Sequence, residues 1–320
     1  MYDVVIVGGG IAAFSAGLYV ARRGLQVLVI AKDIGGQANF TDVIENYPGI
    51  EHVGGYELAS KIKTQAESYG LEFLSAQVTE IKESRGSFVL TAYKQQYKTS
   101  TVILAFGKTP RDLSVPGEEE LKGRGVSYCA TCDAPLFKNK VVTVAGVGDL
   151  NLEAALLCSR FAKKVYILSK TDKLLGHPVL LKAVKVKKNI ELVPFIEILE
   201  IVGSEQVKSI RLKDLKTGSK RELVTDGIFI ELGYVVESGF LNNLLKLDDQ
   251  GQVEVNLDQS TSVKGIFACG DVTNRPYKQA VISAGDGASA GMAAANYLFK
   301  LQGGGAKTSD WTEIKKGRKL

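Results

Sequence analysis

The sequence predicts an α/β protein built from two Rossmann-like nucleotide-binding domains of the three-layer ββα type, with the second domain inserted into the first. Two glycine-rich turns, at residues 8–10 and 146–148, each lie between an apolar strand and a helix, which is the pattern of a dinucleotide-binding unit. A strand at residues 263–268 indicates the insertion, because it reads as a late return of the chain to the first domain. The length of 320 residues suits two domains.

The first glycine turn follows an apolar run at residues 3–7 that is typical of a buried parallel strand, and it precedes a helical pattern at residues 11–23. Gly8 allows the tight turn, Gly10 lets a pyrophosphate approach the backbone, and Ala13 permits close packing of helix on strand. The helix N-terminus supplies unpaired N–H groups and a partial positive charge to the phosphates. These residues predict a dinucleotide site at the start of the chain.

A second segment indicates that the dinucleotide is a flavin. The strand at residues 263–268 runs toward Gly270 and Asp271, and a helix rich in small residues opens at Gln279 and Ala280. A carboxylate at such a strand end can hydrogen-bond the ribityl chain of a flavin, while the helix N-terminus faces the isoalloxazine carbonyls. The alternative, a turn acid that caps a helix, is common for isolated Gly-Asp pairs and less favoured beside the N-terminal turn.

The candidate catalytic residues are Cys129 and Cys132, two residues apart, with Asp133 directly after them. A dithiol at this spacing can close into a disulfide and reopen, so it stores two electrons. The carboxylate is within reach of both sulfurs and can carry the proton that thiolate chemistry must move. The pattern therefore predicts redox chemistry.

Two other interpretations of the cysteine pair stay open, half of a zinc site or two buried small hydrophobes. Zinc requires four ligands, and the remaining candidates stand at no ligand spacing: Cys158, Cys269, His52 and His177. We therefore expect no metal site.

In the order of its glycine turns, cysteine pair and Gly-Asp segment, the chain resembles the low-molecular-weight flavoprotein thioredoxin reductases over nearly its whole length. The matching stretches are residues 35–37 (Gly-Gly-Gln), 45–49 (Glu-Asn-Tyr-Pro-Gly), 123–133 (from Gly-Arg-Gly to Cys-Asp) and 267–272 (Phe-Ala-Cys-Gly-Asp-Val). The cysteine stretch and the Gly-Asp stretch together are highly specific.

The resemblance implies FAD as cofactor, thioredoxin or a similar disulfide protein as acceptor, and a homodimer. It implies that Cys132 faces the flavin, that Cys129 attacks the protein disulfide and that Asp133 is the acid. The residues that it places around the FAD, beyond the glycine turn, are Gly36, Gln37, Asn46, Gly270, Asp271, Gln279 and Ala280.

The domain boundaries follow from two linkers. A buried strand at residues 102–107 is followed by turn-forming residues up to 117, and an apolar strand at residues 227–232 precedes the return to the first domain. We therefore expect residues 1–114 and 245–320 to form a discontinuous FAD-binding domain. Residues 115–244 are expected to form the inserted nucleotide-binding-like domain that carries the dithiol.

The inserted domain departs from the family pattern where NADPH would bind. Asn151 replaces the small third residue of the glycine turn, and only Lys170 and Lys173, with Asp172 between them, stand where family members carry an arginine-rich clamp for the 2′-phosphate. A lysine gives a point charge rather than the bidentate fork of arginine. NADPH is therefore doubtful as donor, and NADH is not favoured either, since Ser169 replaces the acid that would bind its ribose.

Some family members that lack the NADPH signatures take electrons from reduced ferredoxin, and this chain is similar to them. The alternative is that the two lysines suffice for NADPH. Residues 138–190 contain 11 lysines and arginines against three acids, an excess of eight positive charges. A solvated basic face is the common explanation, and a docking surface for an acidic partner such as ferredoxin is the sharper one. Nucleic acid is disfavoured because no aromatic residues interleave the lysines.

Two other functions compete with disulfide reduction. A ferredoxin–NADP reductase of related fold would not need the cysteines. A non-catalytic redox sensor would not need both a full set of flavin-binding residues and a dithiol.

Four cysteines with one close pair, no secretory signal and no apolar run of roughly 20 residues predict a cytoplasmic protein without a membrane span. The C-terminal tail after Gly305 is either disordered or docks Trp311 on a partner subunit or the flavin.

Overall fold

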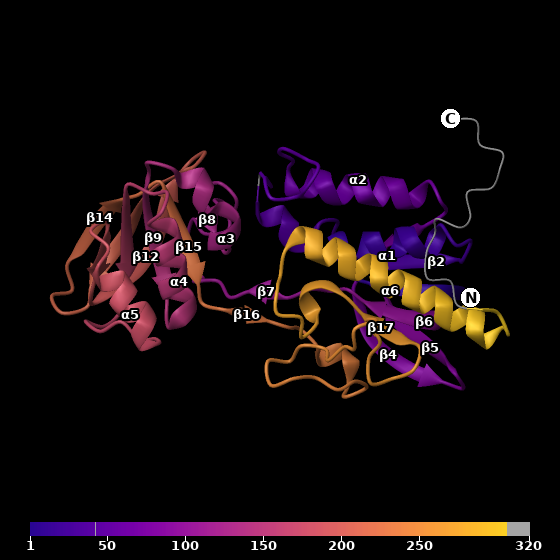
Figure 1. The fold of residues 1–320 in the computed structure, drawn as a ribbon. Coiled ribbons are helices and arrows are strands. Elements are labelled where there is room, and N and C mark those ends of the chain that lie inside the picture. Colours follow the sequence, from indigo (N-terminus) through magenta and orange to yellow (C-terminus); the bar gives the residue numbers. More distant parts are fainter. Residues whose placement is uncertain (42, 306–320) are drawn as a thin grey trace. The chain divides into compact units, whose positions relative to one another are not determined.

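The computed structural model describes residues 1–41 and 43–305, so Trp311 lies outside the described residues. The chain forms two compact units (Figure 1). Unit 1 comprises Met1–Ala38, Tyr56–Lys108 and the chain from Val236, and unit 2 comprises Asn39–Gly55 and Thr109–Val235. The chain therefore leaves the first unit, builds the second and returns, as the α/β fold with two Rossmann-like units requires.

Unit 1 is built on a mixed sheet in the order β3-β2-β1-β6-β5-β4, with β17 also paired to β6. Its strands are β1 (Tyr2–Val7), β2 (Val27–Ala31), β3 (Glu72–Ser75), β4 (Val78–Ser84), β5 (Ser87–Ala92), β6 (Gln95–Leu104) and β17 (Ile266–Ala268). The first half of β6 pairs antiparallel with β5, and its last residues pair parallel with β17. The predicted return of the chain to the first sheet is thus confirmed.

The returning strand is shorter than the predicted 263–268. The amide of Ile266 donates to the carbonyl of Val263 at 3.1 Å, which closes a turn around Gly265 at φ +86°. This left-handed conformation is open to glycine and interrupts an extended strand. Pairing with β6 therefore begins only at Ile266.

Helices α1 (Ile11–Ala21), α2 (Gly55–Glu67) and α6 (Ala280–Leu301) cover unit 1, with α1 and α6 side by side (Figure 1). A Cβ added at Gly287 would lie 2.2 Å from the carbonyl oxygen of Ala12, and one at Gly291 would lie 2.5 Å from that of Ala16. Glycine is required at both positions because the two backbones approach so closely. This contact joins the C-terminal helix to the first helix of the chain.

Unit 2 is built on a parallel sheet in the order β11-β10-β9-β15-β8. Its strands are β8 (Val126–Ser127), β9 (Val141–Gly146), β10 (Lys164–Leu168), β11 (Ile190–Val193) and β15 (Gly227–Glu231). Its helices are α3 (Ala130–Asp133), α4 (Asp149–Cys158) and α5 (Pro178–Lys185). A second, antiparallel sheet contains β12 (Ile196–Gly203), β13 (Val207–Asp214) and β14 (Lys220–Val224).

The sequence after the second glycine turn predicts a helix over residues 149–161, but α4 ends at Cys158. The Asn189 side-chain amide donates to the carbonyls of Ser159 at 2.9 Å and Ala162 at 3.1 Å. With these carbonyl oxygens bonded to Asn189, the chain turns after Cys158 instead of continuing the helix. Asn189 therefore sets the end of α4, although it lies 30 residues from Ser159 in sequence.

Two connecting segments pair as a short antiparallel ribbon, β7 (Thr109–Pro110) with β16 (Tyr234–Val235). Both strands group with unit 2. Unit 2 therefore begins its long segment at Thr109, and unit 1 resumes at Val236, earlier in the chain than the expected boundaries at residues 115 and 245. The limits of the domains as folding units stay a prediction.

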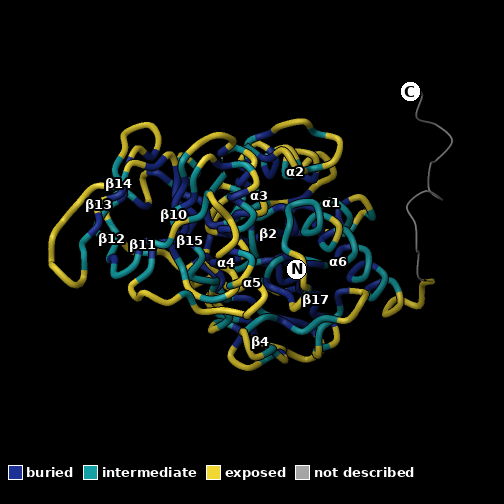
Figure 2. Tube along the Cα trace, turned by 60° about the vertical axis from the view of Figure 1, so that its left-hand side comes forward, coloured by how far each residue is buried: buried dark blue, intermediate teal, exposed yellow. Residues whose placement is uncertain are grey.

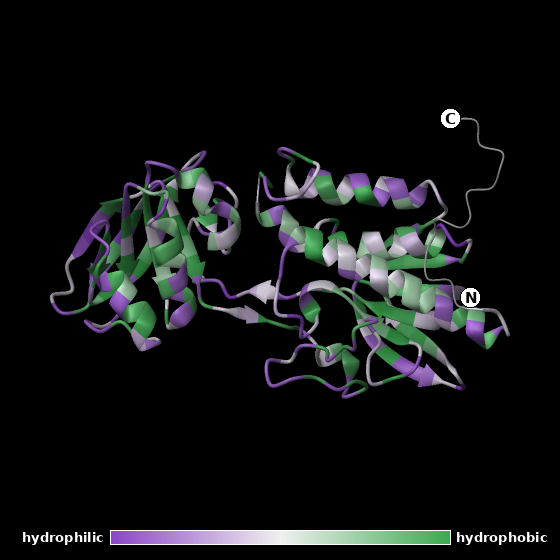
Figure 3. Cartoon of the chain, in the orientation of Figure 1, coloured by the Kyte–Doolittle hydropathy of each residue, from purple (hydrophilic) through white to green (hydrophobic). Residues whose placement is uncertain are grey.

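Apolar residues cover both faces of the main sheet of each unit (Figures 2 and 3). In β1, Val4 and Ile6 pack into one core cluster of unit 1, whereas Val5 and Val7 pack into the cluster on the other face. Alternate side chains of a strand point to opposite faces, which explains why this strand is apolar at consecutive positions. Within residues 1–41 and 43–305, no helix has the length and hydropathy needed to cross a membrane.

Candidate functional site

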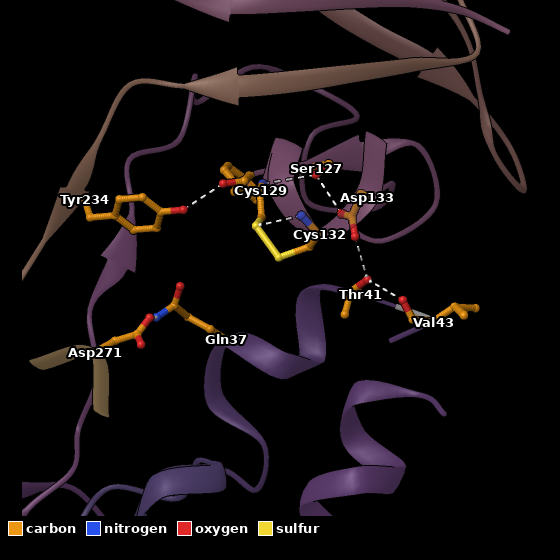
Figure 4. The surroundings of a disulfide bond; sticks show 10 residues. Gln37, Thr41, Val43, Ser127, Cys129, Cys132, Asp133, Tyr234 and Asp271 are labelled. Atoms are coloured by element: carbon orange, nitrogen blue, oxygen red, sulfur yellow. Dashed lines mark hydrogen bonds between the residues drawn. A yellow bond between two sulfur atoms is a disulfide. The ribbon is translucent and has the colours of Figure 1, made fainter. Parts of the chain in front are cut away.

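The predicted redox cysteines form a disulfide in unit 2, with their Cα atoms 5.3 Å apart (Figure 4). Cys129 is the N-cap of α3, and its Sγ accepts a hydrogen bond from the backbone N–H of Cys132 at 3.2 Å. Both cysteines are half-buried, and Thr131 between them is exposed. An amide N–H directed at Cys129 Sγ stabilises the negative charge that this sulfur would carry after reduction.

Asp133 is buried behind the disulfide, 7% exposed. Its Oδ2 accepts a hydrogen bond from Ser127 Oγ at 2.7 Å, and its Oδ1 lies 3.2 Å from Thr41 Oγ1 (Figure 4). Ser127 Oγ in turn accepts from the backbone N–H of Cys129 at 3.1 Å. Burial raises the pKa of Asp133 above its ordinary value, against the opposing effect of the two hydroxyl donors.

The Thr41 hydroxyl suits both protonation states of Asp133, because it also lies 3.3 Å from the Val43 carbonyl oxygen. When Asp133 is ionised, Thr41 donates to the carboxylate. When Asp133 is protonated, its O–H can donate to Thr41 Oγ1, and Thr41 then donates to Val43. The carboxyl can therefore gain or lose a proton without leaving a buried polar group unpaired.

Hydrogen bonds hold both the side-chain hydroxyl and the backbone carbonyl group of Tyr128, the residue before Cys129. The Tyr128 hydroxyl lies 2.8 Å from Glu118 Oε1 and 2.9 Å from Asp112 Oδ1, and burial raises its pKa. Tyr234 Oη donates to the Tyr128 carbonyl oxygen at 2.7 Å. Glu118, 3% exposed, also accepts the backbone N–H of Ser114 at 2.7 Å. This network fixes the segment that leads into Cys129.

We predict that Glu118→Ala lowers the free energy of unfolding by about 3 kcal/mol, because it leaves buried donors without an acceptor. Glu119→Ala is the matched control, since its side chain is 80% exposed and pairs with Lys122. Denaturant titration of both variants measures the difference. Equal midpoints for the two variants would show that Glu118 does not support this segment.

In unit 1, the first glycine turn leaves room for a phosphate. Gly8 has φ +121°, and a Cβ there would lie 2.2 Å from the carbonyl oxygen of Ala105. A Cβ at Gly10, the N-cap of α1, would meet only the Gly35 carbonyl oxygen at 3.8 Å. No side chain caps α1, and no acid lies in its first turn, among the residues that the structure describes. The open space and the helix N–H groups fit the pyrophosphate of FAD.

The other residues expected around the flavin fall into two sets. Gln37 Nε2 donates to Asp271 Oδ2 at 3.2 Å (Figure 4), and Ser283 Oγ at the start of α6 donates to Asp271 Oδ1 at 3.3 Å. Unit 1 also contains Ala13, Gly36, Gly270, Gln279 and Ala280. The structure groups Asn46 with unit 2 instead.

The sequence patterns did not predict three residues of the site. Thr41 and Ser127 contact Asp133; no local pattern marked Thr41, and Ser127 lies within the matching stretch 123–133 without being singled out. Lys278 lies just before α6, half-buried, and donates to the Thr273 carbonyl oxygen. Burial lowers the pKa of Lys278 to about 8, against the attraction of Asp271. A cation directly before the predicted flavin-facing helix was the available signal.

The second glycine turn, in unit 2, has the backbone of a nucleotide site with unusual side chains. Gly148 caps α4 at φ +81°. Asn151 is 3% exposed, and its Oδ1 has no hydrogen-bond partner in the described structure. Lys170 and Lys173 are exposed and form no ion pair within residues 1–41 and 43–305. The same part of the chain contains no group of three or more His, Cys, Asp or Glu side chains placed to hold a metal.

The family model described as pyridine nucleotide-disulphide oxidoreductase matches residues 2–287. The chain is 41% identical over 305 residues to thioredoxin reductase of Treponema pallidum, an alignment covering 94% of this chain and 98% of that protein. It is 36% identical over 304 residues to thioredoxin reductase of Bacillus subtilis, covering 94% of this chain and 96% of that protein.

Among solved structures, thioredoxin reductase from Streptococcus pyogenes superposes with a TM-score of 0.90 at 35% identity, covering 94% of this chain and 99% of that chain. The fold is therefore that of the thioredoxin reductases. Because the family model spans most of the sequence and the relatives match nearly end to end, the chain belongs to the low-molecular-weight thioredoxin reductases of the pyridine nucleotide-disulphide oxidoreductase family.

Proposed function

We propose that this chain is an FAD-dependent thioredoxin-disulfide reductase that exports electrons through Cys129 and Cys132. The observation that carries the proposal is a disulfide with a buried, doubly hydrogen-bonded carboxyl directly behind it. Bound FAD would supply two electrons to the disulfide. Two electrons and two protons convert the disulfide to a dithiol, which then reduces the disulfide of thioredoxin to a dithiol and becomes a disulfide again.

The two sulfurs have different roles. Cys129 attacks one sulfur of the thioredoxin disulfide, forming a mixed disulfide and releasing the other sulfur as a thiolate. Cys132 then attacks Cys129 Sγ, which closes the enzyme disulfide and frees the second thioredoxin sulfur. The N–H of Cys132 directed at Cys129 Sγ supports this order, because it stabilises the attacking thiolate. The resemblance implies that Cys132 is the sulfur facing the flavin.

Asp133 holds and moves the proton that these steps require. We predict that Asp133→Asn lowers the rate of thioredoxin reduction about 10²- to 10⁴-fold. The exposed carboxylate of Asp249 offers a control in Asp249→Asn, which should retain the wild-type rate. A wild-type rate in Asp133→Asn would remove this carboxyl from the mechanism.

The pKa of Asp133 also predicts how stability depends on pH. The folded-state pKa is raised, so the folded protein favours the neutral carboxyl. The contribution of Asp133 to the free energy of unfolding is fully present below the ordinary pKa of 3.8 and is lost as the pH rises through the raised folded value. Asp133→Asn cannot ionise and should lack this loss, which denaturant titrations from below pH 3.8 to neutrality would show.

FAD would be held in unit 1 by the open glycine turn and the two helix N-termini. Gly8 and Gly10 shape the phosphate site, Ala13 packs the helix on the sheet, and Asp271 with Gln37 offers polar groups to the ribityl chain. The remaining residues that we propose for flavin binding are Gly36, Gly270, Gln279 and Ala280 of unit 1, and the resemblance adds Asn46, which groups with unit 2.

For the electron donor we propose reduced ferredoxin rather than NADPH. Two reduced ferredoxins would deliver one electron each, and two protons would come from solvent, for each thioredoxin disulfide reduced. Support comes from the exposed Lys170 and Lys173, which offer no bidentate grip on a 2′-phosphate, and from the buried Asn151 in the second glycine turn. The conventional alternative, NADPH, is supported by the backbone of that turn and by the family match.

Anaerobic bleaching of the flavin distinguishes the donors. Purified holoenzyme is mixed with NADPH, NADH or reduced ferredoxin, and the visible absorbance of the flavin is followed. We expect rapid, stoichiometric bleaching with ferredoxin and slow or partial bleaching with either nicotinamide. Rapid stoichiometric bleaching by NADPH would overturn the ferredoxin proposal and leave the reductase function intact. A protein that is purified colourless and cannot retain flavin would overturn the reductase function itself.

The homodimer and the cytoplasmic location are also proposals, the first from the resemblance and the second from the cysteine content. A ferredoxin–NADP reductase activity is the weaker alternative, because it leaves the disulfide and Asp133 without a role.

A further inference from the structure

An exposed apolar cluster lies where the second nucleotide-binding unit would hold its dinucleotide. We call it the edge patch, and it consists of Val147 (65% exposed), Leu150 (49%), Leu175 (63%) and Val179 (66%). Val147 follows the end of β9, and Leu175 lies in the segment that follows β10. Ligands of parallel α/β sheets bind at these carboxyl ends of the strands. Apolar side chains facing water at this edge indicate a binding surface.

Direct contacts join the two segments that carry the edge patch. Asp149 Oδ1, on the first turn of α4, accepts the backbone N–H of His177 at 2.6 Å. A Cβ added at Gly176 would lie 2.5 Å from the Leu152 side chain and 2.7 Å from Asp149 Oδ1. The patch residues flank these contacts in sequence, two between the end of β9 and the first turn of α4, and two between Leu175 and the first turn of α5. The contacts therefore hold the two segments that carry the patch residues next to each other.

Lysines surround the edge patch. Lys170 and Lys173 precede Leu175, and Lys182 lies one helical turn after Val179 on α5, where Figure 3 shows hydrophobic and hydrophilic residues together. All three lysines are exposed and form no ion pair among the described residues. The acids nearby in the chain are Asp172 and Glu153, which are exposed, and Asp149, which is engaged by His177. Residues 138–190 as a whole carry an excess of eight positive charges, so the part of unit 2 that bears the patch is positively charged.

We propose that the edge patch with its lysines is the docking surface for an acidic electron-donor protein, which takes the place of a dinucleotide at this edge. This inference rests on the proposed ferredoxin donor and adds where that donor binds. An apolar centre with a charged rim is the usual anatomy of a protein interface, and the lysine rim selects and steers a partner rich in Asp and Glu. A second copy of this chain fits less well, because a two-fold contact would set lysine rim against lysine rim.

The test compares charge reversal on the rim with charge reversal elsewhere in the same unit. Lys170→Glu/Lys173→Glu changes the rim, and the matched control Lys208→Glu/Lys220→Glu changes exposed lysines at β13 and β14. A purified acidic [4Fe–4S] ferredoxin, reduced photochemically, is mixed with each holoenzyme in a stopped-flow instrument. Reduced methyl viologen, a small donor that needs no docking surface, provides the parallel measurement.

We expect the rim variant to lower the second-order rate constant of flavin reduction by ferredoxin at least about tenfold at low salt, an effect that shrinks as salt is added. Reduction by methyl viologen should be unchanged, and the control variant should resemble the wild type with both donors. Leu175→Ser should weaken the reaction with ferredoxin about tenfold, at low and high salt alike.

Equal ferredoxin rates in the rim variant, the control and the wild type would overturn the docking surface while the ferredoxin donor stands. A wild-type flavin that ferredoxin does not reduce, but NADPH does, would overturn both. If the rim variant instead changes the sedimentation coefficient of the enzyme, the edge patch is an interface between copies of this chain, and the proposal is wrong.

Discussion

Cys132→Ser should lower the turnover of thioredoxin disulfide by about 10³-fold or more while the protein retains its flavin. The serine oxygen cannot form a disulfide with Cys129, so the variant has no two-electron store between flavin and thioredoxin. The appearance of thioredoxin thiols, with reduced methyl viologen as electron source, measures the loss. This donor makes the result independent of whether NADPH or ferredoxin serves the enzyme.

Cys158→Ala is the matched control, because it removes a buried sulfur of unit 2 that takes no part in the disulfide. It should keep most of the turnover, although the small cavity will lower stability somewhat. If Cys132→Ser turned over thioredoxin at the wild-type rate, electrons would bypass the dithiol. The proposed function would then be wrong, whatever the donor.

Gly10→Asp should give a folded protein that is purified nearly free of flavin. A Cβ at this position meets nothing closer than the Gly35 carbonyl oxygen at 3.8 Å, so the fold can accept a side chain. The new carboxylate would occupy the space at the N-terminus of α1 that fits the pyrophosphate and would repel its charge. The flavin-to-protein absorbance ratio measures the loss, and circular dichroism checks that the fold persists.

The control for this variant lies at the other end of α1. Gly24 has φ +75° and open space around it, and asparagine tolerates this conformation better than most residues, so Gly24→Asn should keep its flavin. A Gly10→Asp protein with full flavin content would contradict the placement of the FAD phosphates at this turn. A variant that fails to fold would be followed by Gly10→Ala, which adds a methyl group without charge and should lose flavin only in part.

Much of the fold could be predicted because its signals are local. The run from Val4 to Val7 is apolar at every position, which only a strand buried on both faces requires, and the helix after Gly10 shows its period directly. Element ends were harder to predict. Asn189 sets the end of α4 from a distant position in the chain, and Gly265 shortens the returning strand through its backbone conformation.

The candidate site also combines residues that the sequence predicted with residues that only the structure shows. Spacing alone paired Cys129 with Cys132, since residues three apart lie close in any turn or helix. Thr41 lies 92 residues from Asp133 in sequence, and nothing in its local pattern distinguishes it from a surface threonine. The edge patch could not be predicted either, because leucine and valine are usually buried and only the structure gives their exposure.

The amino-acid sequence by itself determined the class of fold and the redox dithiol, because each depends on residue types at short spacing. The tertiary structure alone decided which side chains surround Asp133, how Tyr128 is held and which apolar residues face water. Those contacts join segments far apart in the chain, and their geometry follows from how sheets and helices pack rather than from any local pattern.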